Sequence, residues 1–361
     1  MPDPTFSVPM QLTAEQRAIV EHGLEHCLIT AVAGSGKTTT LAWRIRHLLE
    51  QGQDPARLLI LMFNRSARED FEHKLAKVCA NTGLQRPDVR TYHALGLRLY
   101  KRFVQEGYLP DWQGQPLSEA EIQLQVWHLL RQLVPDAQQD RLKREKKEAI
   151  ALACQFIDRA KTTLRPADSV FEDMGLAPEM HYLIDVFHGF EHWRKRTHRI
   201  SFADMLYEPV MAIHQHGALQ KLVGNKMDMI LVDEYQDTNE IQHLLLRYIA
   251  GERARVTVVG DPDQTIYEFR GARPEFIQHR FADEFDNPVM LNLSYSFRYG
   301  DQVALLANHL ISHNSGRRDL LCRAHPSTPA TQACVHHTAD EPALILRLLA
   351  AWQHEGRALN E

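Results

Sequence analysis

The stretch CLITAVAGSGKTT, residues 27–39, decides how the rest of the chain is interpreted. A short apolar run leads into a glycine-rich loop, and a Lys-Thr pair then opens a helix whose apolar face carries Leu41, Ile45 and Leu48. Strand, loop and helix in this order are the context of a phosphate-binding loop (P-loop), in which backbone N–H groups at a helix N-terminus hold phosphates. A plain strand-to-helix turn does not require Lys-Thr, so the stretch predicts a nucleotide site.

The residues of the P-loop divide into predicted roles. Backbone N–H groups around residues 33–36 are expected to hold phosphate oxygens, with Lys37 over the β- and γ-phosphates and the Thr38 hydroxyl on Mg²⁺. Ala31 departs from the general pattern GxxxxGK[ST], because it stands at the position of the first glycine. The predicted nucleotide-binding residues of the loop are Ala31, Val32, Ala33, Gly34, Ser35, Gly36, Lys37, Thr38 and Thr39.

Length and composition are those of an ordinary soluble protein. The chain has 361 residues, 44% hydrophobic and 24% charged, which suffices for about two to three domains. No apolar run approaches the about 18 residues of a membrane span, and the N-terminus lacks a signal pattern, so we expect a cytoplasmic protein without membrane association. Because the net charge is -5, a nucleic acid would have to be held in a local groove rather than by a global positive field.

The five cysteines form no CxxC pair and are expected to be reduced thiols that pack in the interior. One group of residues has spacing that could supply zinc ligands: Cys322, His325, Cys334, His336 and His337. In a chain with 20 histidines, chance clustering accounts for the same pattern more simply.

Apolar strands that alternate with amphipathic helices predict a parallel sheet. Residues 58–63, 227–233, 255–261 and 289–293 are short apolar runs typical of buried strands, and residues 89–99 begin as a strand and pass into a helix. Residues 12–22 are expected to form a helix with a capping box between Thr13 and Gln16.

From about residue 96 to 200, amphipathic helices follow one another without a convincing strand, which predicts an inserted helical unit. Its two basic tracts, residues 141–144 and 194–199, are interpreted as solvated faces rather than binding sites.

Two acidic residues follow one of the apolar runs, in LVDEYQDTN at residues 231–239. Asp233 and Glu234 have the Walker B arrangement, in which the first carboxylate holds Mg²⁺ through water and the second orients or deprotonates the attacking water. The gap between Lys37 and Asp233 exceeds what a minimal βαβ core needs, which supports the insertion.

The segment VVGDPDQTIYEFRGARP, residues 258–274, carries three kinds of group close together. Gln264 is a neutral side chain that could sense a γ-phosphate, and Arg270 is a cation. Tyr267 and Phe269 could stack on bases, which contributes about 1–3 kcal/mol per base for any sequence. The alternative is that both are core aromatics, since residues two apart on a strand share one face.

Together the motifs resemble the UvrD/Rep-type helicases of superfamily 1, from residue 12 to about 298 and weakly beyond. The resemblance rests on LTAEQ (12–16), AVAGSGKT (31–38), MFNRSA (62–67), RTYHAL (90–95), SFADML (201–206), LVDEYQDTN (231–239), VVGDPDQTIYEFRGA (258–272) and LSYSFR (293–298). It implies an α/β fold: a RecA-like P-loop NTPase parallel sheet with an inserted helical subdomain and the start of a second RecA-like domain. The implied ranges are 1–95 and 201–291 for the ATP-binding domain, 96–200 for the insertion and 292–361 for the incomplete second domain.

The resemblance also implies a function. The family consists of motors that hydrolyse ATP with Mg²⁺, translocate along single-stranded DNA in the 3′-to-5′ direction and unwind duplex. Expected partners are single-stranded DNA and duplex/single-strand junctions, with the protein a monomer or weak dimer.

Residue roles follow by position in the motifs. Gln16 would contact the adenine edge, in competition with its capping role, and Phe297 would stack on adenine. The implied catalytic residues are Lys37, Asp233, Glu234, Gln264 and Arg298, with Thr38 and Asp233 at the metal and Gln264 and Arg298 at the γ-phosphate. The implied strand path consists of Phe63, Asn64, Tyr92, His93, Tyr267, Phe269 and Arg270.

Four departures from the family pattern bear on these roles. MFNRSA is one residue shorter than usual, Phe269 stands where many members have tryptophan, and Ser296 replaces a frequent asparagine. Motifs V and VI are absent, and loss of the motif VI arginine costs on the order of 10³–10⁵ in rate, so we expect nucleotide binding with weak or no turnover by this chain alone.

Two other functions fit parts of the pattern. A non-motor module would bind nucleotide, DNA or partner proteins without turnover. A P-loop kinase of small metabolites would explain the P-loop but leave Tyr267, Phe269 and Arg298 without a role.

Overall fold

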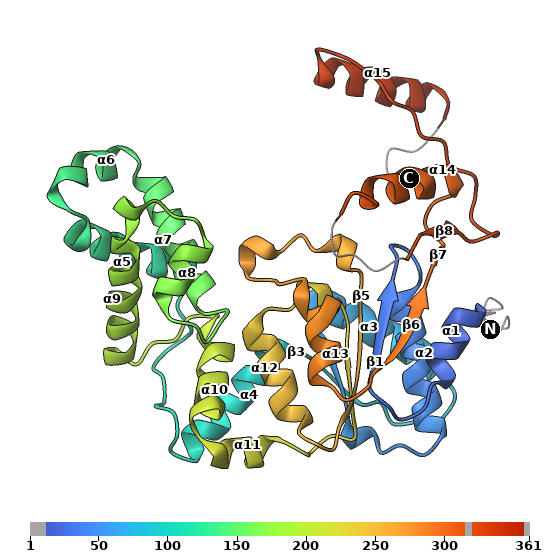
Figure 1. Cartoon of the computed structure of the whole chain (residues 1–361), viewed down its shortest axis with the longest axis horizontal. Helices are drawn as coiled ribbons and strands as arrows, with labels where there is room; N and C mark the ends of the chain where they lie inside the picture. The colour runs from blue at the N-terminus through green and yellow to red at the C-terminus, as the bar shows by residue number, and fades with distance from the viewer. Residues whose placement is uncertain (1–11, 315–319, 357–361) are drawn as a thin grey trace.

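The computed structural model describes residues 12–314 and 320–356, and its central element is a six-stranded parallel sheet (Figure 1). The strand order is β3-β2-β4-β5-β1-β6, and every pairing is parallel. The strands are β1 (Cys27–Ala31), β2 (Leu58–Met62), β3 (Asp88–Thr91), β4 (Met229–Val232), β5 (Arg255–Gly260) and β6 (Val289–Leu293). The predicted α/β fold with a parallel sheet is confirmed.

Helices cover both faces of the sheet, which is why its central strands are apolar along their whole length. One face packs on α1 (Ala14–Glu21), α2 (Lys37–Glu50) and α3 (Arg65–Val78). The other packs on α4 (Tyr92–Gln105), α10 (Asp204–Gln215), α11 (Gly217–Val223), α12 (Glu240–Ala250) and α13 (Phe281–Glu284). Successive residues of β1 alternate between the two cores, with Leu28 in one and Ile29 in the other.

A separate helical unit interrupts the sheet between β3 and β4, and it lies to one side of the sheet in Figure 1. It consists of α5 (Glu119–Leu133), α6 (Gln139–Arg144), α7 (Lys146–Ala160), α8 (Ala167–Asp173) and α9 (Tyr182–Arg196). Its own core draws residues from Leu117 to Phe190. Helix α4 instead packs with the sheet through Leu99 and Phe103, so packing does not change at residue 96, where the insertion was predicted to begin.

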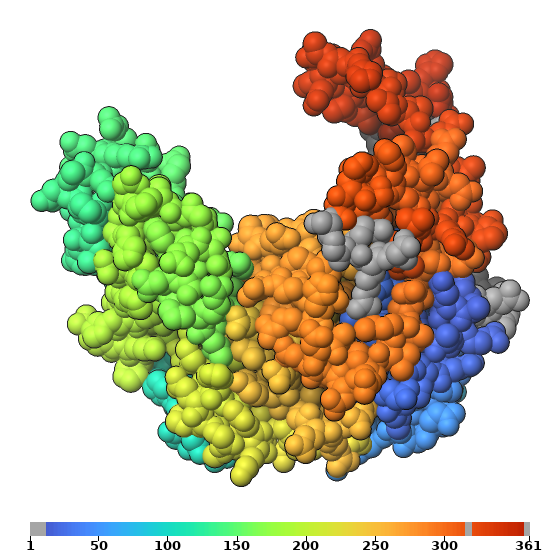
Figure 2. Space-filling model, viewed as in Figure 1, coloured from blue at the N-terminus to red at the C-terminus, as the bar shows by residue number. Residues whose placement is uncertain are grey.

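Beyond β6 the chain forms a smaller second unit. Strands β7 (Tyr295–Ser296) and β8 (Arg323–Ala324) pair in parallel. Helix α14 (Asp301–Ile311) lies between them in the sequence and packs on β8, and α15 (Glu341–His354) follows β8. Several large apolar side chains on these two helices face solvent, among them Leu305 (71% exposed) and Leu310 (73%). Figure 2 shows a hollow between the helical unit and this C-terminal unit, with the orange-coloured chain of the sheet domain as its floor. Within the described residues, every helix is too short or too polar to cross a bilayer.

Candidate nucleotide and nucleic-acid site

The P-loop leaves β1 at Ala31 and enters α2 at Lys37. Gly34 and Gly36 have φ of +75° and +78°, a region that side chains other than glycine rarely adopt. Gly36 caps α2 without a side-chain acceptor, so the N–H groups of the first turn keep their positive end free for a ligand. The Ser35 hydroxyl is buried and has no hydrogen-bond partner among the described residues. A loop with unused donors at a helix N-terminus fits a phosphate group.

Two neighbouring segments hold this loop in place. Gln16 donates from Nε2 to the Ser35 carbonyl (3.2 Å) and accepts at Oε1 from the Thr13 N–H (3.0 Å), which completes the predicted capping box. Both ends of the Gln16 amide are therefore used within the protein. On the other side, the Phe297 N–H donates to the Gly34 carbonyl (2.9 Å), and a β-carbon on Gly34 would lie 2.6 Å from Cβ of Arg298.

The acidic pair after β4 meets the P-loop lysine directly. Lys37 Nζ lies 2.8 Å from Glu234 Oε2, across 197 residues of sequence. Asp233 is buried, and its Oδ1 accepts the Glu234 N–H at 2.9 Å. Glu234 has φ of +51°, a left-handed conformation that costs free energy in a residue with a side chain and turns its carboxylate toward Lys37.

Besides Glu234, three carboxylates lie close enough to Lys37 for its charge to oppose the rise in pKa that burial causes: Asp233, Asp237 and Asp261. The site therefore holds more acidic groups than this one lysine can neutralise. Burial, and then the Glu234 charge, raise the pKa of Asp233, and the same two causes raise the pKa of Asp237 to about 6. Burial also raises the pKa of Asp261. Buried carboxylates with too few cations around them fit a divalent ion, and Asp233 with the Thr38 hydroxyl would hold Mg²⁺.

Gln236 connects the acidic pair to the next strand, a contact that the sequence did not predict. Its Nε2 donates to Glu234 Oε2 (2.9 Å), and its Oε1 accepts the N–H of Asp261 (3.1 Å) at the end of β5. Asp261 in turn accepts from Gln264 Nε2 (2.5 Å). The strand β5 lies between β1 and β4, and hydrogen bonds through Asp261 and Gln236 connect the predicted γ-phosphate sensor Gln264 to Glu234.

The predicted base-stacking aromatics form one surface group. The rings of Phe63 and Tyr267 stack at 5.3 Å with an interplanar angle of 25°, and Tyr267 and Phe269 lie 6.1 Å apart. The Arg270 guanidinium lies over both of the latter rings, 5.3 and 5.4 Å from their centroids. Phe269 is 58% exposed, which argues against the alternative of a core aromatic at this position.

The remaining residues of the predicted strand path are placed differently. Tyr92 is only 2% exposed and belongs to the core beside α4, so the prediction that it lines a surface path is not supported by its position. His93 stacks on Phe202 (centroids 4.1 Å apart), and Phe202 is 60% exposed. The sequence motif SFADML contained Phe202, but nothing in the pattern distinguished it. Asn64 caps α3 by accepting the Ala67 N–H (2.8 Å).

The C-terminal unit contributes Phe297 and Arg298 beside the P-loop. The exposed Phe297 ring lies 4.4 Å from the His325 ring, and the Arg298 charge acts on Glu234. The cysteine and histidine residues of the possible zinc site do not converge in the described part of the chain. Cys322 is buried against Tyr299, whereas Cys334 is exposed.

The P-loop follows β1 of the parallel sheet, and the acidic pair follows β4, two strands away. The strand between them, β5, leads to the polar side chain of Gln264. This arrangement is that of a P-loop NTPase. Residues 12–286 match the UvrD/REP helicase N-terminal domain family, and the chain belongs to that family. It is 29% identical to DNA helicase II of Escherichia coli (strain K12) over 97% of the chain and 47% of that protein. It is 28% identical to ATP-dependent DNA helicase Rep of the same organism over 84% of the chain and 44% of that protein. The chain thus spans about half the length of these relatives.

Proposed function

We propose that this chain is the ATP-binding portion of a DNA helicase that moves along single-stranded DNA. The contact between Lys37 and Glu234 supports the proposal most strongly, because it joins the lysine of the P-loop to a glutamate that would act as general base. Lys37 would bind the β- and γ-phosphates, with Mg²⁺ on Thr38 and Asp233 to neutralise phosphate charge. Gln264 and Arg298 would contact the γ-phosphate. The 3′-to-5′ direction and the preference for duplex/single-strand junctions are part of the proposal and rest on the family.

The charge arrangement suggests how nucleotide binding prepares the base. Burial alone would raise the pKa of Glu234, but the Lys37 charge, together with hydrogen bonds from Lys37 and Gln236, holds this pKa below its usual value. A phosphate that takes Lys37 away from Glu234 removes the largest of these opposing effects. The pKa of Glu234 then rises, and the carboxylate becomes a stronger base toward a water molecule.

The exposed aromatics supply the proposed nucleic-acid contact. Phe63, Tyr267 and Phe269 offer neighbouring ring faces beside Arg270, and single-stranded DNA binds such surfaces by stacking without regard to sequence. We add Phe202, exposed on His93, to this path and omit the buried Tyr92.

Binding of a fluorescent ADP analogue with Mg²⁺ tests the nucleotide site. We expect Lys37→Ala to abolish binding, because it removes the cation that would bind the β- and γ-phosphates, and the exposed Lys221→Ala to bind like the wild type. Glu234→Gln should retain nucleotide but abolish any DNA-stimulated hydrolysis. Normal turnover in both Lys37→Ala and Glu234→Gln would refute the assignment.

Anisotropy of a labelled oligo(dT) tests the strand path. Tyr267→Ala and Phe269→Ala should each weaken binding by about 5–150-fold, the equivalent of one lost base stack, whereas Tyr108→Ala removes an exposed aromatic elsewhere and should have no effect. Affinity should also fall steeply with salt. With the chain joined to a complete second RecA-like domain, nucleotide binding without turnover at any DNA concentration would select the non-motor alternative, and a phosphorylated metabolite would select a kinase.

A further inference from the structure

The helical unit touches the proposed DNA path at the end of α7. We call residues 159–163 the junction segment and residues 261–273 the stacking loop, since the latter carries Tyr267 and Phe269. Gly271 in the stacking loop has φ of +94° and lies directly against the junction segment. A β-carbon on Gly271 would come within 2.7 Å of both Cβ of Thr162 and Nη1 of Arg159.

The stacking loop is a closed turn at this contact. The N–H groups of Gly271 and Ala272 donate to the carbonyls of Glu268 (2.9 Å) and Tyr267 (3.1 Å), so the glycine is tied to the residues that carry the rings. The Arg273 N–H donates to the Thr238 carbonyl (3.1 Å), which fixes the far end of the loop. A shift of Gly271 therefore moves the aromatic rings with it.

Hydrogen bonds hold the junction segment against α12. Thr162 donates from Oγ1 to the Arg159 carbonyl (2.8 Å), and its own carbonyl accepts the Ile241 N–H (3.2 Å) at the start of α12. Thr163 donates from Oγ1 to Glu240 Oε2 (2.5 Å). Backbone and side-chain bonds to α12 thus fix the C-terminal end of this segment.

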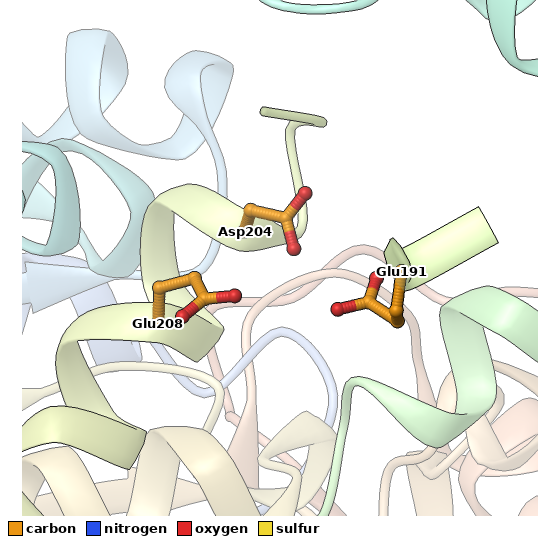
Figure 3. Close-up of side chains that lie close together, drawn as sticks. All are labelled: Glu191, Asp204 and Glu208. Atoms are coloured by element: carbon orange, nitrogen blue, oxygen red, sulfur yellow. The ribbon is translucent and has the colours of Figure 1, made fainter. Parts of the chain in front are cut away.

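Lys161 adds a buried ionic anchor. Its Nζ lies 2.6 Å from Asp204 Oδ1 on α10 and 2.7 Å from Glu191 Oε1 on α9, and its side chain is fully buried. Figure 3 shows the carboxylates of Glu191, Asp204 and Glu208 facing one another. Such a trio could hold a metal ion, but Lys161 and the Arg194 guanidinium already occupy the space among them, so we assign no metal here. The network instead joins α7, α9 and α10 rigidly.

From this arrangement we propose that Thr162 is a positioning residue for base stacking. The anchored junction segment sets the position of Gly271 and, through it, the height of the Tyr267 and Phe269 rings in the DNA path. The inference rests on the proposed function and adds to it a role for the helical unit. It predicts that a change at Thr162 alters how bases stack without altering how nucleotide binds, because among the described residues the hydrogen bonds and ion pairs of this segment lead to α9, α10 and α12 rather than to the P-loop.

The test uses the full chain with an oligo(dT) that contains one 2-aminopurine, whose fluorescence reports stacking. Thr162→Ala removes the hydroxyl and methyl beside Gly271, and we expect about 5–20-fold weaker DNA binding, an altered 2-aminopurine signal and unchanged binding of fluorescent ADP. The matched control is Thr197→Ala, in which the lost hydroxyl also bonds a helix carbonyl (Trp193, 2.8 Å) but lies away from the loop. Thr162→Ser keeps the hydroxyl and should resemble the wild type.

A second pair of variants approaches the contact from the other side. Gly271→Ala inserts a methyl group against Thr162, whereas Gly175→Ala, also at positive φ (+60°) but in open space within the helical unit, imposes only the backbone strain. The loss of DNA affinity in Gly271→Ala should be much larger than the loss in Gly175→Ala. The inference would be overturned if Thr162→Ala had the DNA affinity and the 2-aminopurine signal of the wild type. It would also be overturned if Gly271→Ala and Gly175→Ala bound DNA with equal affinity. Wild-type affinity in Tyr267→Ala and Phe269→Ala would instead overturn the DNA path itself.

Discussion

Replacement of Lys161 by methionine should destabilise the helical unit strongly at neutral pH. Methionine fills most of the volume of the lysine stem, so the cavity contribution is small. The ammonium, however, is the partner of Asp204 and Glu191, and three carboxylates then face the single cation Arg194. Removal of one partner from a buried ion pair typically costs about 3–5 kcal/mol, and we expect a loss in that range.

The stability difference between the wild type and Lys161→Met should depend on pH, and the direction of that dependence follows from the pKa values of the carboxylates. In the wild type, the pKa values of Glu191 and Asp204 are below their usual values, because Lys161 and Arg194 outweigh the effect of burial. Their stabilisation is therefore complete above the unfolded pKa and is lost only as pH falls through the lower folded pKa. Without Lys161, burial raises the pKa of at least one of these carboxylates above its unfolded value. The free energy of unfolding of the variant is then greatest below that unfolded pKa and declines as pH rises through the folded pKa. The difference in the free energy of unfolding between wild type and variant should therefore become smaller as pH falls from 8 to 5.

Urea unfolding followed by tryptophan fluorescence measures the effect, since Trp127 and Trp193 report on the helical unit. The control is Lys195→Met, in which an exposed lysine beside Arg194 is removed, with an expected change within about 0.5 kcal/mol. An unchanged unfolding midpoint of Lys161→Met at pH 8, or a gap that widens toward pH 5, would refute the reasoning.

Three further variants test other parts of the structure. Gly34→Ala places a β-carbon 2.6 Å from Cβ of Arg298 and should weaken nucleotide binding at least tenfold in a titration with fluorescent ADP, whereas Gly52→Ala, at similar φ but in open space, should bind normally. Gln236→Ala leaves the Asp261 N–H buried without its acceptor, so the free energy of unfolding should fall by about 1–3 kcal/mol in urea titration, and hydrolysis should fall with it. Leu305→Gln with Leu310→Gln should reduce binding of a hydrophobic dye, because both side chains are exposed; equal dye binding would show that another surface is responsible.

The sheet was predictable because buried parallel strands are continuous apolar runs, and the P-loop and acidic pair mark two of their ends. The positions of individual side chains were harder to predict from the sequence. Tyr92 shares the helical spacing of Leu95, Leu99 and Phe103, a signal that would have placed it in the core. The tract at 194–199 was interpreted as a solvated face, which is wrong for Arg194, since this residue is buried among acidic partners distant in sequence. Gln236 likewise depends on contacts to Glu234 and Asp261 that only the fold creates.

A continuous set of contacts joins the phosphate site to the helical unit: Lys37 to Glu234, Glu234 to Gln236, Gln236 to Asp261, and the stacking loop from there to Thr162. Adjacency alone does not establish coupling, which requires an element with two states. Under the proposed function Glu234 would be such an element, because Lys37 would bind either its carboxylate or a phosphate. Linkage then requires that DNA change nucleotide affinity by the same factor as nucleotide changes DNA affinity, typically 5–150-fold, and that Gln236→Ala reduce both factors together. Equal nucleotide affinity with and without oligo(dT) would show that the contacts transmit nothing.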